Sequence, residues 1–287
     1  HNHCTKSILS NHMWLGTCVH CSSLLLFPFC SPHHLRHFQA GAKELTLVEK
    51  DRRFLPFLQQ LNEAAENRIQ IYNEDILSFD YTTALKVPEE ATDTVRIIGN
   101  LPFSIATPLL FQYLRMCCNG EGPFGYASTE LTLCFQKEVA DRMVAPPGSA
   151  IRCRISAMVQ HCCEARIVYD LPKKVFVPSP KVDAAVVRLV PLQTINELGI
   201  SFDDMEVTVR SIFSSRRKTI RNNIRSALNF SDGETDEILA ATEIDGALRA
   251  QVLTTLEIQT LCRVLKSKRD PIRPVDPSSG HFVSLTQ

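Results

Sequence analysis

Apolar residues in the middle of the chain come in short runs, and the stretches between these runs have helical spacing. Six runs rich in leucine and β-branched residues predict strands, at Leu45–Val48, Ile69–Tyr72, Val95–Ile98, Leu131–Phe135, Arg166–Tyr169 and Ala185–Leu189. The spacing between them predicts helices over Arg52–Ala65, Pro108–Met116 and Lys137–Met143. Strands that alternate with helices in this way predict an α/β domain with a mostly parallel sheet.

The pattern changes toward the carboxyl end of the chain. The proline-rich stretch Val175–Pro180 cannot be helical, because proline lacks an amide donor and extends the residue before it, so we expect a rigid connector. Beyond Pro191, apolar residues three and four positions apart predict helices within Val207–Leu228, Glu237–Ala241 and Leu256–Leu265. We therefore expect an α/β domain over residues 41–192, a small helical domain over 193–268 and a disordered tail over 269–287.

The first 40 residues differ from the rest. They hold seven of the nine histidines, four of the eleven cysteines and the single tryptophan, and they show no sustained helix or strand period. Their apolar run Leu24–Cys30 is too short to cross a bilayer, which needs about 20 residues, and it lacks the flanks of a secretory signal. We interpret residues 1–40 as an atypical segment, non-native or inserted, and expect any targeting peptide to be absent from this chain.

The composition is that of an ordinary globular protein. Lys and Arg total 31, Asp and Glu also total 31, 44% of residues are hydrophobic and 22% are charged. This balance argues against disorder, collagen and a strongly basic tail, so any surface that binds nucleic acid must be local. The adjacent pairs Cys117-Cys118 and Cys162-Cys163 lie in apolar segments, which favours small buried side chains in a reducing compartment over a disulfide framework.

Two acidic residues follow successive predicted strands. Glu49 comes directly after Leu45–Val48, and Asp75 comes shortly after Ile69–Tyr72. Ligands of open α/β sheets bind outside the carboxyl ends of the strands, where Glu49 could accept both hydroxyl protons of a ribose and Asp75 a proton of an adenine amino group. The alternative is that both residues only cap the helices that follow. Together they favour a nucleoside-shaped ligand.

A third group of residues, Gly99–Phe103, follows the strand Val95–Ile98. The amide oxygen of Asn100 and a backbone carbonyl stiffened by Pro102 could accept protons from a planar amino group, and Phe103 could stack on its ring. Such contacts would orient a weakly nucleophilic nitrogen and stabilise the positive charge that develops on it, without a strong general base. The alternative is an ordinary strand-to-helix turn with a buried phenylalanine.

A cluster of cations lies in the predicted helical domain. Arg216–Arg225 holds five cations in ten residues with no acid among them, while Ile220, Ile224 and Leu228 have the spacing of a buried helix face. Charge runs are usually only solvated surface. On a chain of zero net charge, however, this one predicts a phosphate-binding stripe for folded RNA.

Four segments in this order resemble the ribosomal RNA adenine dimethyltransferase family: Gly99–Phe103, Phe135–Arg142, Phe176–Asp183 and Phe213–Ile220. The resemblance extends over about residues 43–268. Ile97–Ser104 and the stretch from Glu243 to Cys262 are most similar to its mitochondrial branch, the dimethyladenosine transferases, also described as mitochondrial transcription factor B.

The resemblance implies a Rossmann-like, S-adenosylmethionine-dependent methyltransferase sheet with a small C-terminal helical domain. It implies an rRNA adenine N(6)-dimethyltransferase that modifies two adjacent adenines in a hairpin of small-subunit ribosomal RNA. The expected location is the mitochondrial matrix, and the expected partners are that RNA, the small ribosomal subunit and the mitochondrial transcription machinery, with no membrane.

The resemblance also implies roles for individual residues. It places Glu49 and Lys50 on the cofactor's ribose, Asp75 and Ile76 on its adenine, and Asn100 beside the cofactor. The target amine would be held by Asn100, Leu101, Pro102 and Phe103. Phe176 would stack on the extruded adenine, although by itself it equally fits a core aromatic. RNA would be contacted by Arg216, Arg217, Lys218, Arg221 and Arg225. No metal is expected.

The sequence departs from the family before Glu49. The family's first strand and glycine-rich cofactor loop are missing from the pattern, and the only early glycines are Gly16 and Gly41. Thr5–Ser10 resembles the helix after that loop and Ala42–Leu45 the return to the next strand. We interpret residues 11–39 as an insertion from a retained intron or faulty gene model, in a chain truncated upstream. A zinc site at Cys18-x-x-Cys21 and Cys30-x-x-His33 is the weaker alternative.

Without the loop, we expect this polypeptide to be impaired in cofactor binding even if its gene encodes the enzyme. Two further hypotheses stay open. One is an RNA- or DNA-binding factor for ribosome assembly or mitochondrial transcription without catalysis. The other is methylation of adenine in DNA, which would use the same amine-holding motif.

Overall fold

The computed structural model describes residues 21–26, 42–84, 94–125, 128–176, 179–193, 195 and 199–269, with the backbone alone over 21–26. The chain divides into two compact units, His1–Phe202 and Asp203–Gln287. The sequence analysis drew its boundary between residues 192 and 193. The disordered tail expected over 269–287 lies outside the described residues except for Arg269, which ends a helix. No helix in the described ranges is both long and apolar enough for a membrane span.

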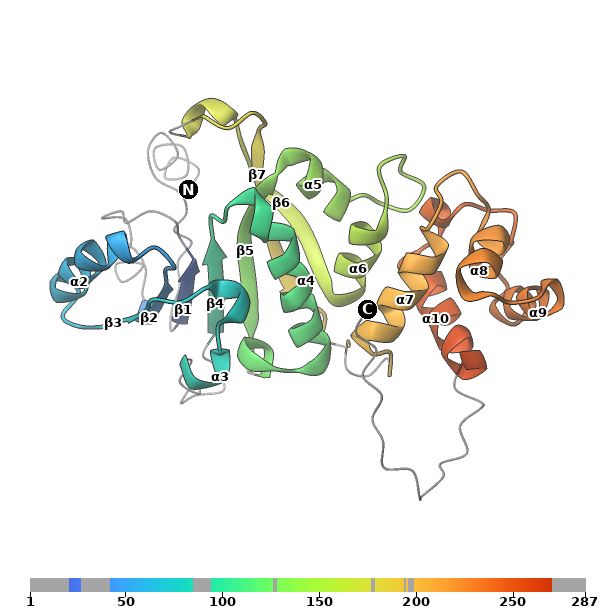
Figure 1. The fold of residues 1–287 in the computed structure, drawn as a ribbon, viewed down its shortest axis with the longest axis horizontal. Coiled ribbons are helices and arrows are strands. Elements are labelled where there is room, and N and C mark those ends of the chain that lie inside the picture. Colours follow the sequence, from blue (N-terminus) through green and yellow to red (C-terminus); the bar gives the residue numbers. More distant parts are fainter. Residues whose placement is uncertain are drawn as a thin grey trace, which may run out of the picture. The chain divides into compact units, whose positions relative to one another are not determined.

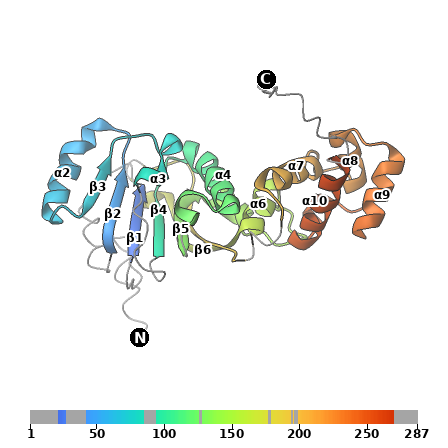
Figure 2. The ribbon, with the colours of Figure 1, turned by 90° about the horizontal axis from the view of Figure 1, so that it is seen from below.

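Unit 1 is built on a seven-stranded sheet in the order β3-β2-β1-β4-β5-β7-β6, whose strands lie side by side in Figures 1 and 2. The strands are β1 (Cys21–Leu26), β2 (Ala42–Val48), β3 (Ile69–Tyr72), β4 (Thr94–Gly99), β5 (Thr129–Gln136), β6 (Cys163–Leu171) and β7 (Ala184–Pro191). Strands β1 to β5 pair in parallel, whereas β7 runs antiparallel to β5 and β6. Each of the six predicted strands lies within an observed strand, and the predicted α/β class is confirmed.

The prediction that the first strand is missing is wrong. Residues 21–26 form β1, which lies between β2 and β4 in the middle of the sheet, where Leu24 pairs with Thr46 and with Ile97. A central parallel strand needs only main-chain partners on both sides and apolar side chains, without a turn signature of its own. The sequence analysis did not recognise β1 as a strand because the composition of the first 40 residues is unusual. The missing glycine-rich loop is a separate matter, because the sequence from 27 to 41 contains no glycine except Gly41.

Helices of 3 to 17 residues connect the strands of unit 1. They are η2 (Arg52–Phe54), α2 (Leu55–Ala64), η3 (Ile76–Ser78), α3 (Tyr81–Ala84), α4 (Phe103–Asn119), η4 (Gly122–Gly125), α5 (Lys137–Met143), α6 (Arg154–Cys162) and η5 (Lys173–Val175). The prediction for α5 is confirmed to the residue. Helix α4 begins five residues before the predicted start, with Pro108 inside it. Helix α6 was missed because its polar residues Ser156 and His161 are buried, which breaks the apolar spacing.

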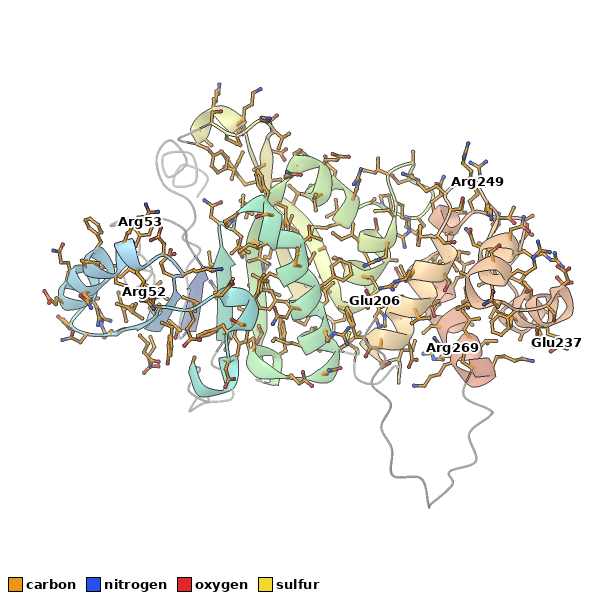
Figure 3. The ribbon with its side chains drawn as sticks, viewed as in Figure 1. Arg52, Arg53, Glu206, Glu237, Arg249 and Arg269 are labelled. Carbon is orange, nitrogen blue, oxygen red and sulfur yellow. The ribbon has the colours of Figure 1, made fainter. Side chains whose placement is uncertain are left out.

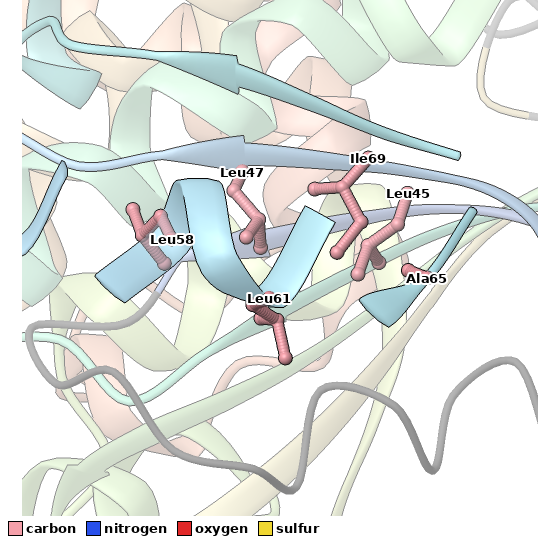
Figure 4. Close-up of a cluster of buried hydrophobic side chains, with 6 residues drawn as sticks. All are labelled: Leu45, Leu47, Leu58, Leu61, Ala65 and Ile69. Carbon is pink, nitrogen blue, oxygen red and sulfur yellow. The ribbon is translucent and has the colours of Figure 1, made fainter. Parts of the chain in front are cut away.

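A hydrophobic cluster holds α2 against β2 and β3 (Figure 4). Leu58 and Leu61, three residues apart on one helix face, meet Leu45 and Leu47, two residues apart on one strand face. Ala65 and Ile69 complete the cluster. Burial of such side chains stabilises the fold by about 1.5–3 kcal/mol each, so the cluster fixes the carboxyl ends of β2 and β3.

The C-terminal unit is helical, as predicted. Its elements are α7 (Phe202–Ile212), α8 (Ile220–Leu228), α9 (Asp232–Thr242), η7 (Ala250–Val252) and α10 (Thr255–Arg269). The predicted helical region 207–228 is two helices, because the hydroxyl of Thr219 caps a new helix after a turn at 213–219. Helix α9 begins at a capping box in which Ser231 and Glu234 bond reciprocally.

Candidate active site at the carboxyl edge of the sheet

Glu49, Lys50 and Asp75 meet where β2 and β3 end. The amide of Glu49 donates to the Tyr72 carbonyl at 3.0 Å, which continues the pairing of the two strands beyond their ends. Nζ of Lys50 lies 2.6 Å from Oδ2 of Asp75. The structure therefore brings together residues from the two strand ends that the sequence analysis singled out. Ile76 follows Asp75 and is buried.

Asn73 stiffens this corner and was not singled out from the sequence. Its Nδ2 donates to the carbonyls of Glu49 at 2.7 Å and Lys50 at 3.1 Å. Its Oδ1 accepts from Nε of Arg52, which is labelled in Figure 3, at 3.2 Å. The sequence feature that could have identified Asn73 is its position, since it is a polar amide directly after the strand β3. Its three bonds hold the loop after β2 against the end of β3.

The two carboxyl groups of the corner differ in their electrostatics. Burial raises the pKa of Glu49, although Oε1 accepts a hydrogen bond from the Asp51 amide at 2.7 Å. The Lys50 ammonium lowers the pKa of Asp75, and the Leu77 amide, which donates to Oδ1 at 3.1 Å, lowers it further. Asp75 also caps the 3₁₀ turn η3, whereas η2 is capped by Asp51 and not by Glu49. Burial thus disfavours the ionised form of Glu49, and hydrogen bonds from the hydroxyl groups of a ligand would offset that cost.

The bend Asn100–Phe103 connects β4 to α4. Leu101 is buried, Asn100 is partly buried and Pro102 is exposed. The Pro102 carbonyl accepts from the amides of Ile105 at 3.0 Å and Ala106 at 3.2 Å, which closes the first turn of α4. Since Pro102 also fixes its own φ at −53°, the bend is rigid.

Glu49 and Asn100 lie on the same edge of the sheet. Leu25 of β1 pairs with Leu47 of β2 and with Ile98 of β4, so Glu49 and Asn100 are each two residues beyond the same row. One strand separates them, and neighbouring strands are about 4.8 Å apart, so their backbones are roughly 10 Å apart. A nucleoside-sized ligand spans such a gap.

Phe103 and Phe176 pack against one hydrophobic cluster. It consists of Cys134, Leu171, Ala184 and Val186, at the ends of β5 and β6 and the start of β7. Both rings are only partly buried. Phe176 therefore makes the contacts expected of a core aromatic residue, and part of its side chain is also exposed.

Two of the four motifs line one cavity of about 470 Å³. It is lined by Gln136, Lys137, Glu138, Asp141, Arg142, Ile151, Lys173, Lys181, Val182 and Asp183. Asp183 joins its walls, because its carbonyl accepts from the Lys137 amide at 2.9 Å and its Oδ1 from the Lys173 amide at 2.8 Å. The cavity thus lies at the carboxyl end of β5, beside the loop that carries Phe176.

The five cations of the predicted stripe in the helical unit have different surroundings in the structure. Arg216, Arg217 and Lys218 are exposed in the turn before α8. Arg221 instead pairs with Asp236 at 2.8 Å and with Asp232 at 3.1 Å, and Arg225 pairs with Asp232 at 2.9 Å. These acids belong to α9, so the sequence around the stripe could not reveal them. Three exposed cations of the stripe therefore lie in the turn, and Arg225 on α8 is exposed but ion-paired.

Asn223 shapes that turn from inside. It is 1% exposed, and its Nδ2 donates to the carbonyls of Ile212 at 2.7 Å and Ser215 at 3.0 Å. Its Oδ1 accepts from the Ser214 hydroxyl at 3.1 Å. The sequence analysis did not single out this residue, because its backbone partners lie 11 and 8 positions earlier in the chain and no local pattern marks them.

The chain matches a known protein family and several named relatives. The family described as ribosomal RNA adenine dimethylase matches residues 35–266. The chain is 38% identical over 240 residues to the mitochondrial dimethyladenosine transferase 1 of Xenopus tropicalis and to that of Homo sapiens, covering 80% of this chain and 68% of each relative. It is 34% identical over 265 residues to that of Vermamoeba vermiformis, covering 78% of this chain and 76% of the relative.

Solved structures share the fold. A dimethyladenosine transferase from Plasmodium falciparum superimposes with a TM-score of 0.64 at 20% identity, covering 87% of this chain and 90% of that one. The 23S rRNA methyltransferase ErmE superimposes with a TM-score of 0.58 at 19% identity, covering 86% and 91%. At these identities the likeness is one of fold.

Proposed function

Because the chain belongs to the ribosomal RNA adenine dimethylase family, we propose that it dimethylates the exocyclic amino groups of two adjacent adenines in small-subunit ribosomal RNA. S-adenosylmethionine is the methyl donor of this class of enzyme. The observation that carries the proposal is the common edge of Glu49, Asp75 and Asn100. That edge includes the switch point between β1 and β4, where the strand order reverses and open α/β sheets bind their ligands.

The residues of the corner fit the nucleoside part of S-adenosylmethionine. The partly buried Glu49 would accept the ribose hydroxyls beside Lys50, and Asp75 with Ile76 would contact the adenine. When bound, the cofactor supplies an electrophilic methyl group. The chain's own contribution is to hold that group beside Asn100.

The bend after β4 would orient the target base. Oδ1 of Asn100 and the Leu101 carbonyl would each accept one proton of the adenine amino group, and Pro102 would keep both acceptors in place. Phe103 and Phe176, which share one hydrophobic cluster, would stack on the extruded base. The rigid acceptors would stabilise the amine as it becomes positive, so no general base is required.

Calorimetric titration with S-adenosylmethionine tests the cofactor site of this chain. Stoichiometric binding supports the enzyme and contradicts the expected impairment. The second candidate is an RNA- or DNA-binding assembly or transcription factor without catalysis, and the absence of a glycine-rich loop after β1 favours it. RNA binding without any cofactor binding would support this second candidate.

We expect Glu49→Gln to abolish cofactor binding without lowering stability. Burial raises the Glu49 pKa above its ordinary 4.5, so the folded state is penalised when this carboxyl ionises. The penalty is absent below the ordinary pKa, and it appears as the pH rises through the raised pKa. Glutamine is never ionised and still accepts from the Asp51 amide. The variant should therefore melt at or above the wild-type temperature at pH 7, with the difference disappearing below pH 4.5.

Glu63→Gln, at an exposed position on α2, is the control. It should change neither the affinity for the cofactor nor the melting temperature. If Glu49→Gln melted below the wild type at pH 7, the carboxylate would be a structural cap. If it bound the cofactor as tightly as the wild type, the proposed ribose contact would be wrong.

We propose that the helical region 193–268 binds the RNA and that region 41–192 is catalytic. The exposed turn would contact phosphates through Arg216, Arg217 and Lys218, with smaller contributions from the acid-paired Arg221 and Arg225. The mitochondrial names of the relatives support a location in the mitochondrial matrix and an association with its small ribosomal subunit. We further propose that the protein contacts the mitochondrial transcription machinery. Primer-extension mapping of methylated adenines after depletion tests the substrate.

Replacing Arg217 and Lys218 together with glutamine should weaken RNA binding and reduce its salt dependence. Each phosphate contact contributes roughly 0.7–0.9 to the slope of log affinity against log salt, so the slope should fall by about 1.4–1.8. Lys268→Gln is the matched control, because Lys268 pairs with Glu237, labelled in Figure 3, at 2.7 Å. An unchanged slope in the double variant would place the RNA elsewhere.

A further inference from the structure

Three ligand-bearing side chains meet at the far end of α4 from the bend. Cys118 lies in the last turn of α4, and His161 and Cys162 end α6. Sγ of Cys118 and Sγ of Cys162 are 3.1 Å apart. The two sulfur atoms and an imidazole nitrogen all lie within 4.8 Å of one another. His161 and Cys162 are 0% exposed, whereas Cys118 is partly buried.

The thiols around this group differ in character. Cys117 and Cys163 are buried, and the neighbouring Cys117 thiol together with burial raises the pKa of Cys163. A hydrogen bond from the Cys162 thiol lowers the pKa of Cys118 to about 6, with smaller contributions from His161 and Arg115. The interpretation of the cysteine pairs as small buried side chains thus describes Cys117, Cys162 and Cys163, whereas Cys118 is only partly buried.

We propose that Cys118, His161 and Cys162 bind one Zn²⁺ ion. Zn²⁺ takes sulfur and nitrogen ligands in tetrahedral geometry, and this group offers two sulfurs and one imidazole nitrogen. Two thiolates and a neutral imidazole around Zn²⁺ carry no net charge, which suits a buried position. Zn–S bonds of about 2.3 Å at tetrahedral angles place two sulfurs roughly 3.8 Å apart. The pair therefore has to open by less than about 1 Å.

A water molecule completes the coordination on the side of Cys118, the one partly exposed ligand. Binding releases any thiol proton that remains to solvent, since only the thiolate is a ligand. The ion would join the end of α4 to the junction of α6 and β6. Helix α4 has 17 residues, so at 1.5 Å per residue the site lies about 25 Å from the bend at Asn100. It is therefore independent of the proposed methyl transfer.

The test uses the full chain, purified with reductant and freed of metal, and titrated with Co²⁺ and with Zn²⁺. The wild type should bind one equivalent with a thiolate-to-cobalt charge-transfer band that Zn²⁺ abolishes. Cys118→Ser and Cys162→Ser should lose that equivalent and the charge-transfer band with it. Cys153→Ser is the matched control, because it is a partly buried cysteine at the other end of α6, where serine is a good helix cap.

The cysteines of the first 40 residues require their own control, a Cys18→Ser/Cys21→Ser variant, which should keep the equivalent. If this variant lost the ion while Cys118→Ser kept it, the proposal would be overturned. The proposal would also be overturned if the reduced wild type bound no Zn²⁺. That outcome would count whether or not the protein as isolated contains a Cys118–Cys162 disulfide. Because Cys118 is partly exposed, Cys118→Ser should retain the wild-type circular dichroism spectrum, and His161→Gln provides a second variant that leaves both thiols in place.

Discussion

An Asn100→Ala chain is expected to lose at least about a hundredfold in the rate of methyl transfer while it binds RNA almost as the wild type does. Removing one preorganised polar group beside developing charge typically costs 10²–10³ in rate. Asn100 is partly buried at the start of a rigid bend, and the turn that we propose binds RNA belongs to the other unit. Single-turnover transfer of labelled methyl groups to a small-subunit RNA hairpin measures the rate, and filter binding measures the RNA affinity.

Asn119→Ala is the control for this substitution, because Asn119 is an exposed asparagine at the opposite end of α4. It should transfer methyl groups at the wild-type rate. Equal rates in Asn100→Ala and the wild type would contradict the proposed role of the bend. A wild-type chain that binds RNA but transfers no methyl groups would instead favour the binding factor without catalysis.

The second large effect is expected from Asn223→Ala in the helical unit. The substitution removes three hydrogen bonds and leaves the buried carbonyl of Ile212 and the partly buried carbonyl of Ser215 without this donor. Leaving a buried polar group unsatisfied costs about 1–3 kcal/mol, so we expect a loss of roughly 2–4 kcal/mol. The turn that carries Arg216, Arg217 and Lys218 loses its internal support, and RNA affinity should fall with it. Hydrogen exchange of the α7 and α8 amides measures the local stability.

Asn222→Ala provides a control at the preceding position of the same helix. The Asn222 side chain is exposed, and its backbone amide, which the substitution retains, makes the bond to Thr219. Its exchange rates should correspond to a change within about 0.5 kcal/mol. If the two variants exchanged alike, Asn223 would not organise the turn.

Much of the sheet was predictable because its information is local. Strands such as β3 and helices such as α5 are continuous stretches whose apolar spacing distinguishes them from their neighbours. The candidate residues Glu49, Asp75 and Asn100 were found for the same reason, since each follows a strand and parallel strands end at one edge. Helix α6 was not predictable, because its buried Ser156 and His161 find partners from other segments, such as the Arg142 carbonyl for Ser156.

By itself, the sequence determined the α/β class, the helical second unit, the family and the chemical groups at the strand ends. These follow from spacing along the chain and from short motifs. Only the tertiary structure decided that residues 21–26 complete the sheet, that acids of α9 pair with Arg221 and Arg225, and that Cys118 meets His161 and Cys162. Each of these joins segments far apart in sequence or of unlike composition, and such contacts depend on how the packed elements meet rather than on any local pattern.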